Sequence, residues 1–365
     1  MKVLIFANAL PPRAGGIERH THGLATHLAS IPEIEVVIAC AKSLSSSDEK
    51  RNYKVIEFPS YFIANRLPIP SPIVTGQWRQ LITEIKSADM VILQSHLFPL
   101  NWICTFLGRK IPKRVWITHS SGYIPDKNFM IQSLIRIWEQ FGIYLLKRFT
   151  NYHVTTSINS RQWMESIGIT DIGVIPNAIN PQDFSIRDQN LFSKTKVQFL
   201  FAGRLLEGKG GEEAIKLLNN LSKYTSRLFE LTVIGTGPEL DRMIEEANKS
   251  NFTVHFLGEI NHKEVIKVML HSDILLFTSQ IPESMPTIIL EAAASGMLVV
   301  SVPTEGIEAL VKANVILSEN IEFLPQIIGS AINAVEQSRV VGKNASKYIL
   351  NNFTWEETSN LLLKL

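Results

Sequence analysis

The stretch Pro282-Glu283-Ser284-Met285-Pro286, which continues to Glu291 and Gly296, is the most informative part of this chain. The run before it, Asp273-Ile274-Leu275-Leu276-Phe277-Thr278-Ser279, predicts a buried strand. The second proline of the stretch suits the first position of a helix, and Gly296 suits the residue just past the helix end. Open α/β sheets bind ligands at loops that join a strand to a helix, so we expect the first glutamate to lie at such a site.

Two carboxylates in this stretch, Glu283 and Glu291, stand eight residues apart. At about 1.5 Å of rise per residue they would be roughly 12 Å apart if both were helical. That separation is too large for the two groups to share a proton. It suits two carboxylates that hold the two ends of one extended ligand rich in hydroxyl groups.

The composition bounds the class of protein. A chain of 365 residues is long for one compact domain, so we expect two. Its 45% hydrophobic and 19% charged residues are ordinary for a globular protein, and a net charge of +2 gives no case for nucleic-acid binding. The two cysteines, Cys40 and Cys104, predict buried thiols in a reducing compartment, so we expect a cytoplasmic protein.

The sequence predicts neither a signal peptide nor a membrane span. The apolar N-terminus, residues 1–8, lacks the length and cleavage site of a signal peptide and is typical of a first buried strand. The closest candidate for a membrane span, residues 129–149, is interrupted by charged side chains. These are Arg136, Glu139, Lys147 and Arg148.

Strand-like and helix-like patterns alternate along the chain, which predicts parallel sheets covered by helices. A glycine-containing loop at 13–16 leads into a helix from about Ile17 to Ser30. The first series of expected strands is Lys2–Ala7, Val36–Ala39, Met90–Gln94, Val115–Thr118 and His153–Ser157, and the second is Val197–Ala202, Leu231–Ile234, Val254–Leu257, Ile274–Thr278 and Leu298–Val302.

The two series predict an α/β protein with two doubly wound lobes. Loop-forming residues at 176–181 mark the expected crossing between them. We expect an N-terminal lobe over residues 1–180 and a C-terminal lobe over residues 181–349. A helix at about 350–365 is expected to complete the first lobe.

Two cations in the second lobe are candidates for a pyrophosphate clamp. Arg204 directly follows an expected strand, and Lys209 lies among glycines just before the next helix. Cations at the carboxyl end of a parallel sheet, close to helix N-termini, can hold phosphate groups. A solvated loop with surface charges explains the same residues, and the Gly-Lys-Ser/Thr run of a Walker-type loop is absent.

Three other positions carry weaker signals. Gly235-Thr236-Gly237 resembles the opening of a dinucleotide fingerprint without its third glycine, and a tight turn explains it equally well. Gly15-Gly16 opens onto a helix where backbone N–H groups could meet a phosphate, but an ordinary strand-to-helix turn is slightly favoured. His119, and less clearly His96, follows an expected strand and could bind a substrate, although a lone histidine is more often structural.

Metal sites and protein nucleophiles are not predicted. The sequence contains no Asp-x-Asp, no pair of histidines four residues apart on a helix, no Cys-x-x-Cys and no Gly-x-Ser-x-Gly elbow.

Taken together and in order, these residues resemble glycosyltransferase family 4, a large group of retaining enzymes with the two-lobed GT-B fold. The resemblance covers nearly the whole chain and is strongest at Glu283 and Glu291, which match the family's Glu-x7-Glu motif. It implies two Rossmann-like, doubly wound lobes that face a cleft, the first binding the acceptor and the second the nucleotide sugar. The other matching segments are Gly203-Arg204 with Lys209-Gly210, Gly235 with Gly237-Pro238, Val174-Ile175-Pro176-Asn177, and Gly15-Gly16-Ile17-Glu18.

The resemblance implies a role for each matched residue. Arg204 and Lys209 would bind the donor's diphosphate and stabilise the leaving nucleotide, and Glu291 would accept hydrogen bonds from ribose hydroxyls. Glu283 would hold the donor sugar, and His119 would contact that sugar near the reacting centre. Further donor contacts would come from Gly15 and Gly16, from the backbone of Ser284, Met285, Pro286 and Thr287, and from Ile260 beside the base.

The implied reaction is the retaining transfer of a hexose from a UDP- or GDP-type nucleotide sugar to a glycan or lipid-linked glycan. Cell-surface polysaccharide biosynthesis (O-antigen, capsule or exopolysaccharide) is the expected setting. No metal or other cofactor is expected, because fixed cations would stabilise the charge that grows on the diphosphate. Ser284-Met285 stands where the family often has Gly followed by Phe or Leu, which leaves the sugar's identity open.

Two other classes of function are weighed against this one. An NAD-dependent oxidoreductase would use one Rossmann-like lobe, but the third glycine after Gly235 and a matching ribose carboxylate are missing. A non-catalytic nucleotide-sugar-binding protein would bind the donor without turning it over. The chain keeps all four of the family's charged site residues, which argues against such a loss of catalytic activity. These are Arg204, Lys209, Glu283 and Glu291.

Residues 106–150 form a basic, apolar stretch in the first lobe. They hold eight lysines and arginines against Asp126 and Glu139, a local charge of +6 in a chain of +2. Such an amphipathic surface suits an anionic membrane, and a core-facing helix with solvated charges explains it equally well. We expect a cytoplasmic protein, and the first of these two interpretations gives the hypothesis that it docks peripherally on the inner face of the membrane. The apolar residues are Phe129, Met130, Leu134, Ile137, Trp138, Phe141 and Tyr144.

Overall fold

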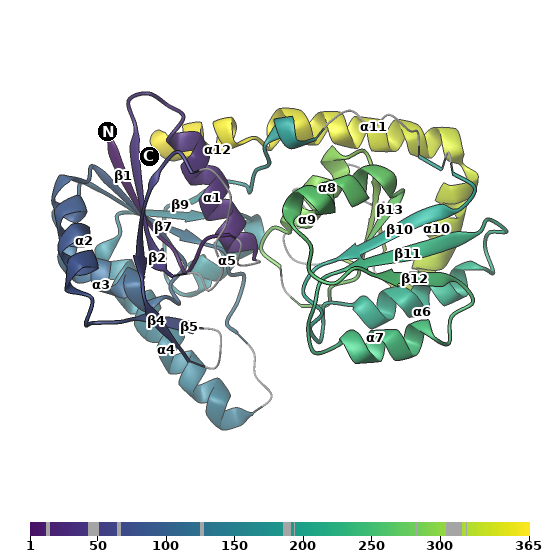
Figure 1. Cartoon of the computed structure of the whole chain (residues 1–365), viewed down its shortest axis with the longest axis horizontal. Helices are drawn as coiled ribbons and strands as arrows, with labels where there is room; N and C mark the ends of the chain where they lie inside the picture. The colour runs from purple at the N-terminus through teal and green to yellow at the C-terminus, as the bar shows by residue number, and fades with distance from the viewer. Residues whose placement is uncertain are drawn as a thin grey trace. The chain divides into compact units, whose positions relative to one another are not determined.

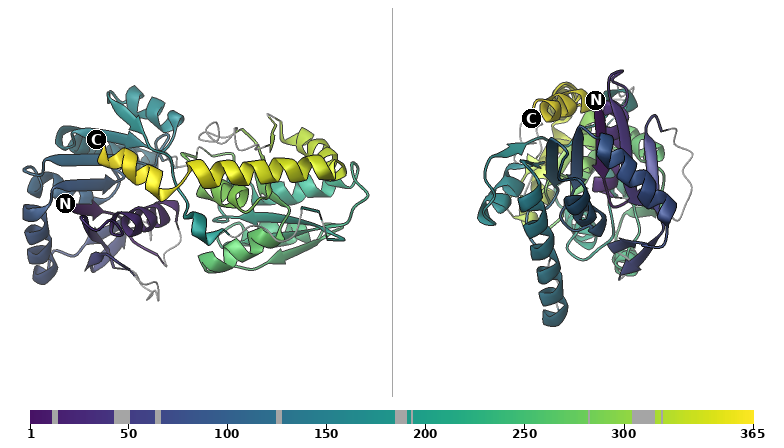
Figure 2. Two further views of the ribbon diagram at one scale, coloured as in Figure 1. Left: turned by 90° about the horizontal axis from the view of Figure 1, so that it is seen from above. Right: turned by 90° about the vertical axis from the view of Figure 1, so that its left-hand side faces the viewer.

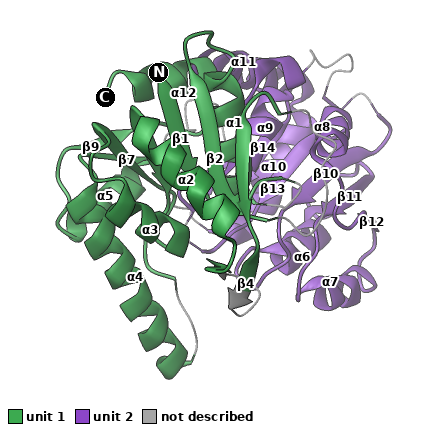
Figure 3. Ribbon diagram, turned by 60° about the vertical axis from the view of Figure 1, so that its left-hand side comes forward, with its two compact units in different colours: residues 1–178, 355–365 green, residues 179–354 purple. Residues whose placement is uncertain are grey.

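The computed structural model describes most of the chain (Figures 1 and 2). The described residues form two compact units, coloured separately in Figure 3. Unit 1 contains Met1–Ala178 and Trp355–Leu365, and unit 2 contains Ile179–Thr354. The described ranges are 1–11, 15–42, 51–63, 67–124, 128–184, 191–192, 194–281, 283–303, 316–318 and 320–365.

Unit 1 is built on a seven-stranded sheet in which every strand pair is parallel. The strand order β3-β2-β1-β6-β7-β8-β9 makes the chain wind outward on one side of β1 and then on the other side from β6. The loops after β1 and β6 therefore flank the switch point, where α/β sheets bind ligands. The strands are β1 (Lys2–Phe6), β2 (Glu35–Ala41), β3 (Lys54–Phe58), β6 (Met90–Gln94), β7 (Lys113–Thr118), β8 (Tyr152–Thr155) and β9 (Ile172–Val174), with a separate antiparallel pair of β4 (Ser60–Ile63) and β5 (Leu67–Pro70).

Six helices in the described part of unit 1 accompany this sheet. The last of them, from the end of the chain, packs on the first: a Cβ atom at Gly23 would lie 2.2 Å from the Trp355 indole. Glycine at this position thus lets the C-terminal helix lie directly against the first helix. The helices are α1 (Gly16–Leu28), α2 (Thr75–Ser87), α3 (Pro99–Leu107), α4 (Phe129–Phe149), α5 (Ile158–Ser166) and α12 (Trp355–Leu363).

Unit 2 has a six-stranded parallel sheet in the order β12-β11-β10-β13-β14-β15. This is the doubly wound order of a Rossmann-type sheet, and its switch point lies between β10 and β13. The strands are β10 (Val197–Ala202), β11 (Phe229–Ile234), β12 (Thr253–Phe256), β13 (Ile274–Phe277), β14 (Leu298–Ser301) and β15 (Ile316–Leu317), and the helices are α6 (Gly211–Leu221), α7 (Leu240–Ala247), α8 (His262–His271), α9 (Thr287–Ala294), α10 (Leu324–Asn333) and α11 (Val335–Asn352), with 3-10 turns η1 (Pro181–Asp183) and η3 (Ile321–Phe323).

The sheet of unit 2 has an apolar core on each face. Successive residues of β10 alternate between them: Phe199 packs with Leu218 of α6, and Leu200 packs with Ile289 of α9. Burial on both faces explains why parallel strands here are continuous apolar runs. The same holds for β1, whose residues 3–6 are fully buried.

The expected strands are all present, with ends that differ by one or two residues. Five described strands were not expected: β3, β4, β5, β9 and β15, of which the last two are too short to leave a pattern. Pro286 is the residue before α9 rather than its first residue, which corrects the expected start by one position. Gly296 follows the end of α9 with a φ of 74°, a left-handed conformation that favours glycine.

Candidate functional site

The loops after β10 and β13 hold the principal candidate residues of unit 2. Because these two strands are neighbours at the switch point, their carboxyl ends meet at one edge of the sheet. The β10 loop carries Arg204 and Lys209, and the β13 loop carries Glu283. The fold thus places these three residues, which the sequence assigned to one ligand, on two neighbouring loops.

Lys209 and Glu283 form an ion pair although they lie 74 positions apart in the chain. Each side chain is 19% exposed, so the pair is largely shielded from water. Ser279, which the sequence analysis missed, donates its hydroxyl hydrogen to Oε1 of Glu283 over 3.1 Å. A cation and a carboxylate are therefore held side by side at the switch point, where the cation can bind a phosphate and the carboxylate a hydroxyl.

Gly210 holds the lysine loop against the end of β13. Its φ is 82°, and a Cβ atom there would lie 2.1 Å from the carbonyl oxygen of Thr278. Thr278 in turn donates from Oγ1 to the Gly210 carbonyl over 2.6 Å, and the Gln280 N–H donates to the Gly208 carbonyl over 2.8 Å. These hydrogen bonds join the two loops and fix the position of the Lys209 backbone.

Arg204 is exposed at the end of β10, and no described residue pairs with its guanidinium. The backbone beside it is pinned by the β11 loop: the Leu205 N–H donates to the Thr236 carbonyl over 3.0 Å. A Cβ atom at Gly235 would lie 1.9 Å from the Gly203 carbonyl oxygen. The Gly-x-Gly segment is therefore a tight turn that packs against the arginine loop.

Glu291 lies on the buried side of α9 and is 4% exposed. Its Oε1 is 2.9 Å from Nε2 of His262, the first residue of α8, whose side chain is 33% exposed. Asp183 lies near this pair: burial raises the pKa of its carboxyl, His262 opposes the shift, and Glu291 adds a smaller rise. Neither His262 nor Asp183 was expected from the sequence, because nothing in their neighbouring residues marks them.

The segment Ser284–Thr287 leads from the ion pair into α9. Ser284 and Met285 are both buried, and Met285 packs in the apolar core with Ile289. The side chain of Met285 is thus buried in the core, so the groups of this segment that can bind a ligand are those of its backbone. Ile260, assigned to the base, is half-buried against the same core.

In unit 1, Gly15 and Gly16 begin α1 after the β1 loop. A Cβ atom at Gly16 would meet nothing within 4 Å, whereas one at Gly15 would lie 2.0 Å from Oε2 of Glu18. Asn8 donates to the other oxygen of that carboxylate over 3.3 Å. The first turn of α1 is therefore covered on one side by its own buried glutamate and open at Gly16.

His119 follows β7 and is half-buried. Its Nε2 is 2.6 Å from Oε1 of Gln94, the last residue of β6, and the His20 ring from α1 stands edge-on at 4.7 Å. Burial lowers the pKa of His119 to about 4, and burial followed by the influence of His119 lowers the pKa of His20 well below its usual value. Gln94 and His20, which the sequence analysis missed, thus surround a histidine that is neutral at neutral pH.

His96 is a core residue. It is fully buried, and its Nε2 lies 3.8 Å from Oε1 of Glu139 on α4. The aromatic rings of Trp116 and Trp163 surround it at 5.9 and 5.5 Å.

Six of the seven apolar residues that the sequence predicted for the surface of α4 are exposed, whereas Trp138 is half-buried and donates from Nε1 to the Leu97 carbonyl over 3.0 Å. Phe129 is 84% and Met130 is 76% exposed, and this end of α4 projects away from the sheet of unit 1 (Figures 2 and 3). Glu139 is the acidic residue of the helix and is buried, whereas the basic residues face outward. Of the other basic residues in 106–150, Lys113 and Arg114 bond to backbone carbonyls within unit 1, and Lys127 with Asp126 lies outside the described residues.

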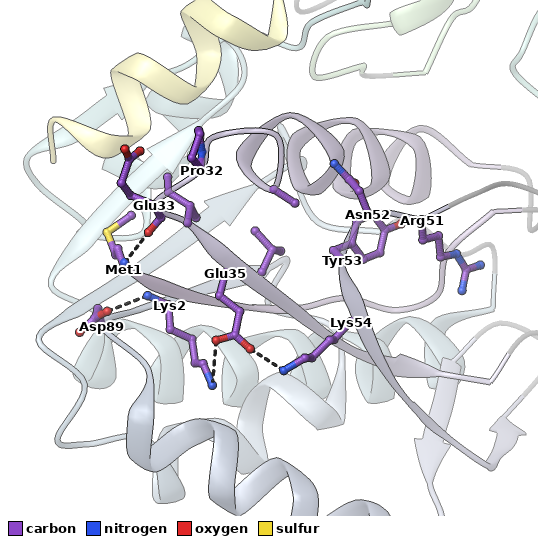
Figure 4. Close-up of a pocket in the computed structure, with 13 residues that line it drawn as sticks. Met1, Lys2, Pro32, Glu33, Glu35, Arg51, Asn52, Tyr53, Lys54 and Asp89 are labelled. Carbon is purple, nitrogen blue, oxygen red and sulfur yellow. Dashed lines mark hydrogen bonds and ion pairs between the residues drawn. The ribbon is translucent and has the colours of Figure 1, made fainter.

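A pocket of about 750 Å³ lies elsewhere in unit 1, at the amino ends of β1, β2 and β3 (Figure 4). Its charged residues pair with one another: Lys2 with Glu35 at 3.4 Å, and Lys54 with Glu35 at 2.6 Å. It is at the opposite edge of the sheet from the loops that bind ligands in this fold class.

No described helix is long and apolar enough to cross a membrane. Within the described ranges, no group of three histidine, cysteine or acidic residues is arranged to hold a metal ion. Both cysteines, Cys40 and Cys104, are buried free thiols, as expected.

These features define the class: a GT-B protein, with two Rossmann-like units of parallel sheet and a charged switch point in the second. Its fold is shared by the solved structure of HepE from Anabaena in complex with UDP-glucose, with a TM-score of 0.76 and 16% identity over 100% of this chain and 98% of that chain.

The sequence comparisons give the family. Residues 14–183 match the family model described as Glycosyltransferase Family 4, and residues 182–348 match the model described as Glycosyl transferases group 1. The chain belongs to this family of glycosyltransferases. It is 24% identical to an uncharacterized glycosyltransferase of Methanocaldococcus jannaschii over 98% of this chain and 96% of that protein. It is 26% identical to the phosphatidylinositol N-acetylglucosaminyltransferase GPI3 subunit of Saccharomyces cerevisiae over 97% of this chain and 80% of that protein.

Proposed function

We propose that the protein is a retaining hexosyltransferase whose unit 2 binds a nucleotide-diphosphate sugar of UDP or GDP type. The observation that carries the proposal is the Lys209–Glu283 pair at the switch point of the unit 2 sheet. Arg204 lies on the same loop with its guanidinium exposed. A diphosphate needs cations, and a sugar needs hydrogen-bond acceptors, so one loop pair offers both.

Donor binding exchanges partners within this pair. The diphosphate oxygens take the place of Glu283 on the Lys209 ammonium. The released carboxylate, which keeps its hydrogen bond from Ser279, accepts hydrogen bonds from the sugar's hydroxyls. The ion pair of the free protein thus keeps both groups in position until the donor arrives.

Glu291 holds the nucleotide's ribose. A carboxylate that is 4% exposed and fixed by His262 at 2.9 Å is positioned in advance to accept two neighbouring hydroxyl groups. His262 and Asp183 set the charge around this carboxylate, and Ile260 borders the base.

The chemistry is electrostatic. As the glycosidic bond loosens, negative charge grows on the diphosphate, and Arg204 and Lys209 stabilise that state more than the bound ground state. The departing phosphate takes the proton of the acceptor hydroxyl on the same face of the sugar, which gives retention. These two cations stabilise the leaving diphosphate as a divalent metal does in other transferases, so the proposed reaction requires no metal. Unit 1 contributes Gly15 and Gly16 to the diphosphate and His119 to the sugar.

Calorimetric titration tests the binding part of the proposal. UDP or GDP is expected to bind the wild-type protein, and Glu291→Ala is expected to weaken that binding at least about tenfold, since a ribose hydrogen bond to a charged group is worth about 1.5–3 kcal/mol. NAD serves as the matched ligand that should not bind. Equal affinity of wild type and variant for the nucleotide would show that Glu291 does not bind it. Binding of a nucleotide sugar without any turnover would instead indicate a non-catalytic sensor.

We further propose that α4 docks on an anionic membrane, so that the acceptor is a lipid-linked glycan of cell-surface polysaccharide synthesis. The exposed face of α4 combines apolar side chains with Arg136, Lys147 and Arg148, and its acidic residue is buried. Apolar area and positive charge together favour anionic interfaces. The yeast relative is named for transfer to phosphatidylinositol, which is consistent with a lipid acceptor.

Vesicle flotation tests the docking. Phosphatidylglycerol vesicles at low salt are expected to carry the wild-type protein, and phosphatidylcholine vesicles are not. Replacing Phe129 and Met130 by serine should lower the bound fraction roughly tenfold, because two apolar side chains no longer enter the interface. Leu228→Ser is the matched control, since this residue of unit 2 is 63% exposed. Equal flotation of both variants, or none for the wild type, would contradict docking through α4.

A further inference from the structure

One side-chain amide in unit 1 lies between two histidines. Gln94 is fully buried at the end of β6. Its Oε1 is 2.6 Å from Nε2 of His119, and its Nε2 is 3.4 Å from Nδ1 of His20. Each end of the amide therefore faces one nitrogen of one imidazole.

The chemistry of the amide dictates where the protons of the two rings lie. An amide oxygen only accepts, so Nε2 of His119 must donate and must carry a proton. An amide NH₂ group only donates, so Nδ1 of His20 must offer its lone pair. A neutral ring has a single N–H, which leaves Nδ1 of His119 as an acceptor. No described residue hydrogen-bonds to that nitrogen.

The surroundings keep both rings neutral. Burial is the main reason that the pKa of each lies below the usual value, and the ring of one lowers the pKa of the other further. Among the described residues, the titratable group that faces His119 from a neighbouring element is His20 on α1. Gln94 on β6 and Trp355 on α12, whose ring lies 5.4 Å from His20, do not titrate.

The C-terminal helix α12 packs beside His20, the second hydrogen-bond partner of the Gln94 amide. Trp355 lies against Gly23, where any side chain larger than hydrogen would collide with the indole, and its ring is edge-on to His20. The C-terminal helix therefore fixes His20, His20 fixes one end of Gln94, and the other end of Gln94 fixes His119. Three elements distant in sequence converge on the orientation of one imidazole.

We propose that Gln94 is a positioning residue, which holds His119 with its proton on Nε2 so that Nδ1 accepts a hydrogen bond from a hydroxyl of the donor sugar. The role toward the sugar rests on the proposed function. The position of the proton does not, since it is a property of the free protein. His119 then selects a donor with a hydroxyl at that place and rejects one in which only an acceptor stands there.

Nitrogen-15 NMR of the histidine side chains in the full-length protein tests the proposal without any ligand. At neutral pH, His119 should show a protonated Nε2 and an unprotonated Nδ1, with the signal assigned by its loss in His119→Gln. Gln94→Leu should give a mixture of the two neutral forms for His119 and alter His20. His22, whose Nδ1 is 2.7 Å from the Tyr53 hydroxyl, is the internal control and should not move.

Gln94→Glu adds a readout that lost packing would not mimic. A carboxylate between two imidazoles favours their charged forms, so the midpoint for protonation of His119 should rise by about one pH unit or more. Gln94→Leu should lower kcat for donor hydrolysis roughly tenfold, with a smaller change in the donor KM. A proton on Nδ1 of His119 in the wild type would overturn the proposal, as would a tautomer left unchanged by Gln94→Leu. If the proton lies on Nε2 but no nucleotide sugar is bound or hydrolysed, the proposed function fails and the positioning role stands.

Discussion

Replacement of Lys209 by alanine separates a role in catalysis from a role in stability. In the free protein the ammonium pairs with Glu283, and both side chains are 19% exposed. The variant leaves Glu283 with its hydrogen bond from Ser279 and with partial access to water. A partly shielded pair of this kind contributes about 1 kcal/mol, so the free energy of unfolding should fall by about that amount.

The effect on the reaction should be much larger. Lys209 meets the diphosphate while its negative charge grows, and a charge-assisted hydrogen bond to such a group is worth about 1.5–3 kcal/mol. Removal of one preorganised donor from a developing anion typically lowers kcat by about 10²–10³. We therefore expect donor hydrolysis by Lys209→Ala to be roughly 10²–10³ times slower. Lys209→Arg should retain part of the activity, since it keeps the charge.

A matched variant in the same unit provides the control. Lys196 pairs with Glu230 at 3.1 Å at the amino end of the same sheet, away from the switch point. Lys196→Ala should cost similar or less stability and leave hydrolysis within about twofold. Mass spectrometry of the released nucleotide measures the rates, and urea unfolding measures the stability. Activity of Lys209→Ala within about threefold of wild type would refute the assignment of this lysine to the diphosphate.

Three further predictions follow from single features of the structure. Gly210→Ala should destabilise the protein by about 2 kcal/mol or more, because its φ is 82° and the new Cβ would collide with the Thr278 carbonyl; Gly16→Ala, which meets no atom, should change the urea midpoint little. The neutral His119 and His20 rings should make the fold lose stability as the pH falls from the ordinary pKa of 6.5 toward about 4, because the unfolded chain takes up protons first; His119→Gln should flatten this fall, and an unchanged urea-midpoint profile would contradict it. Donor hydrolysis should persist after dialysis against EDTA, and its loss with recovery on adding a divalent metal would refute metal independence.

The fold could be predicted because parallel strands leave a direct trace in the sequence. Strands such as β10 and β13 are buried on both faces and appear as continuous apolar runs bounded by glycine or polar residues. The sequence placed Arg204 and Lys209 correctly at the end of β10. Short strands such as β9 were not predicted, because three residues are too few to show a hydrophobic pattern.

The partners within each site could not be predicted, because topology chooses them. Lys209 meets Glu283 from 74 positions away, and His262 meets Glu291 from 29 positions away on a different helix. Neither His262 nor Ser279, which donates to Glu283, belongs to a sequence motif that would predict its contact. Burial of Met285 is likewise a property of the core on that face of the sheet and not of its neighbours in sequence.

The network around His119 shows the same limit more sharply. Gln94 is the last residue of a predicted strand, and this position in the sequence does not predict which residues its side-chain amide contacts. Its importance depends on α1 and α12, which come from opposite ends of the chain and pack through Gly23 and Trp355. Contacts of that range come from the packing of the whole unit.

Whether unit 2 binds and activates a nucleotide sugar is tested most directly by a mass-spectrometric screen for donor consumption over a panel of nucleotide sugars, run in parallel on wild type and Glu291→Ala. The wild-type protein should release nucleotide from a UDP- or GDP-linked hexose, and the variant should release at least about tenfold less from the same donor. Equal consumption by both proteins, or a folded wild type that consumes no donor in the panel, would contradict it.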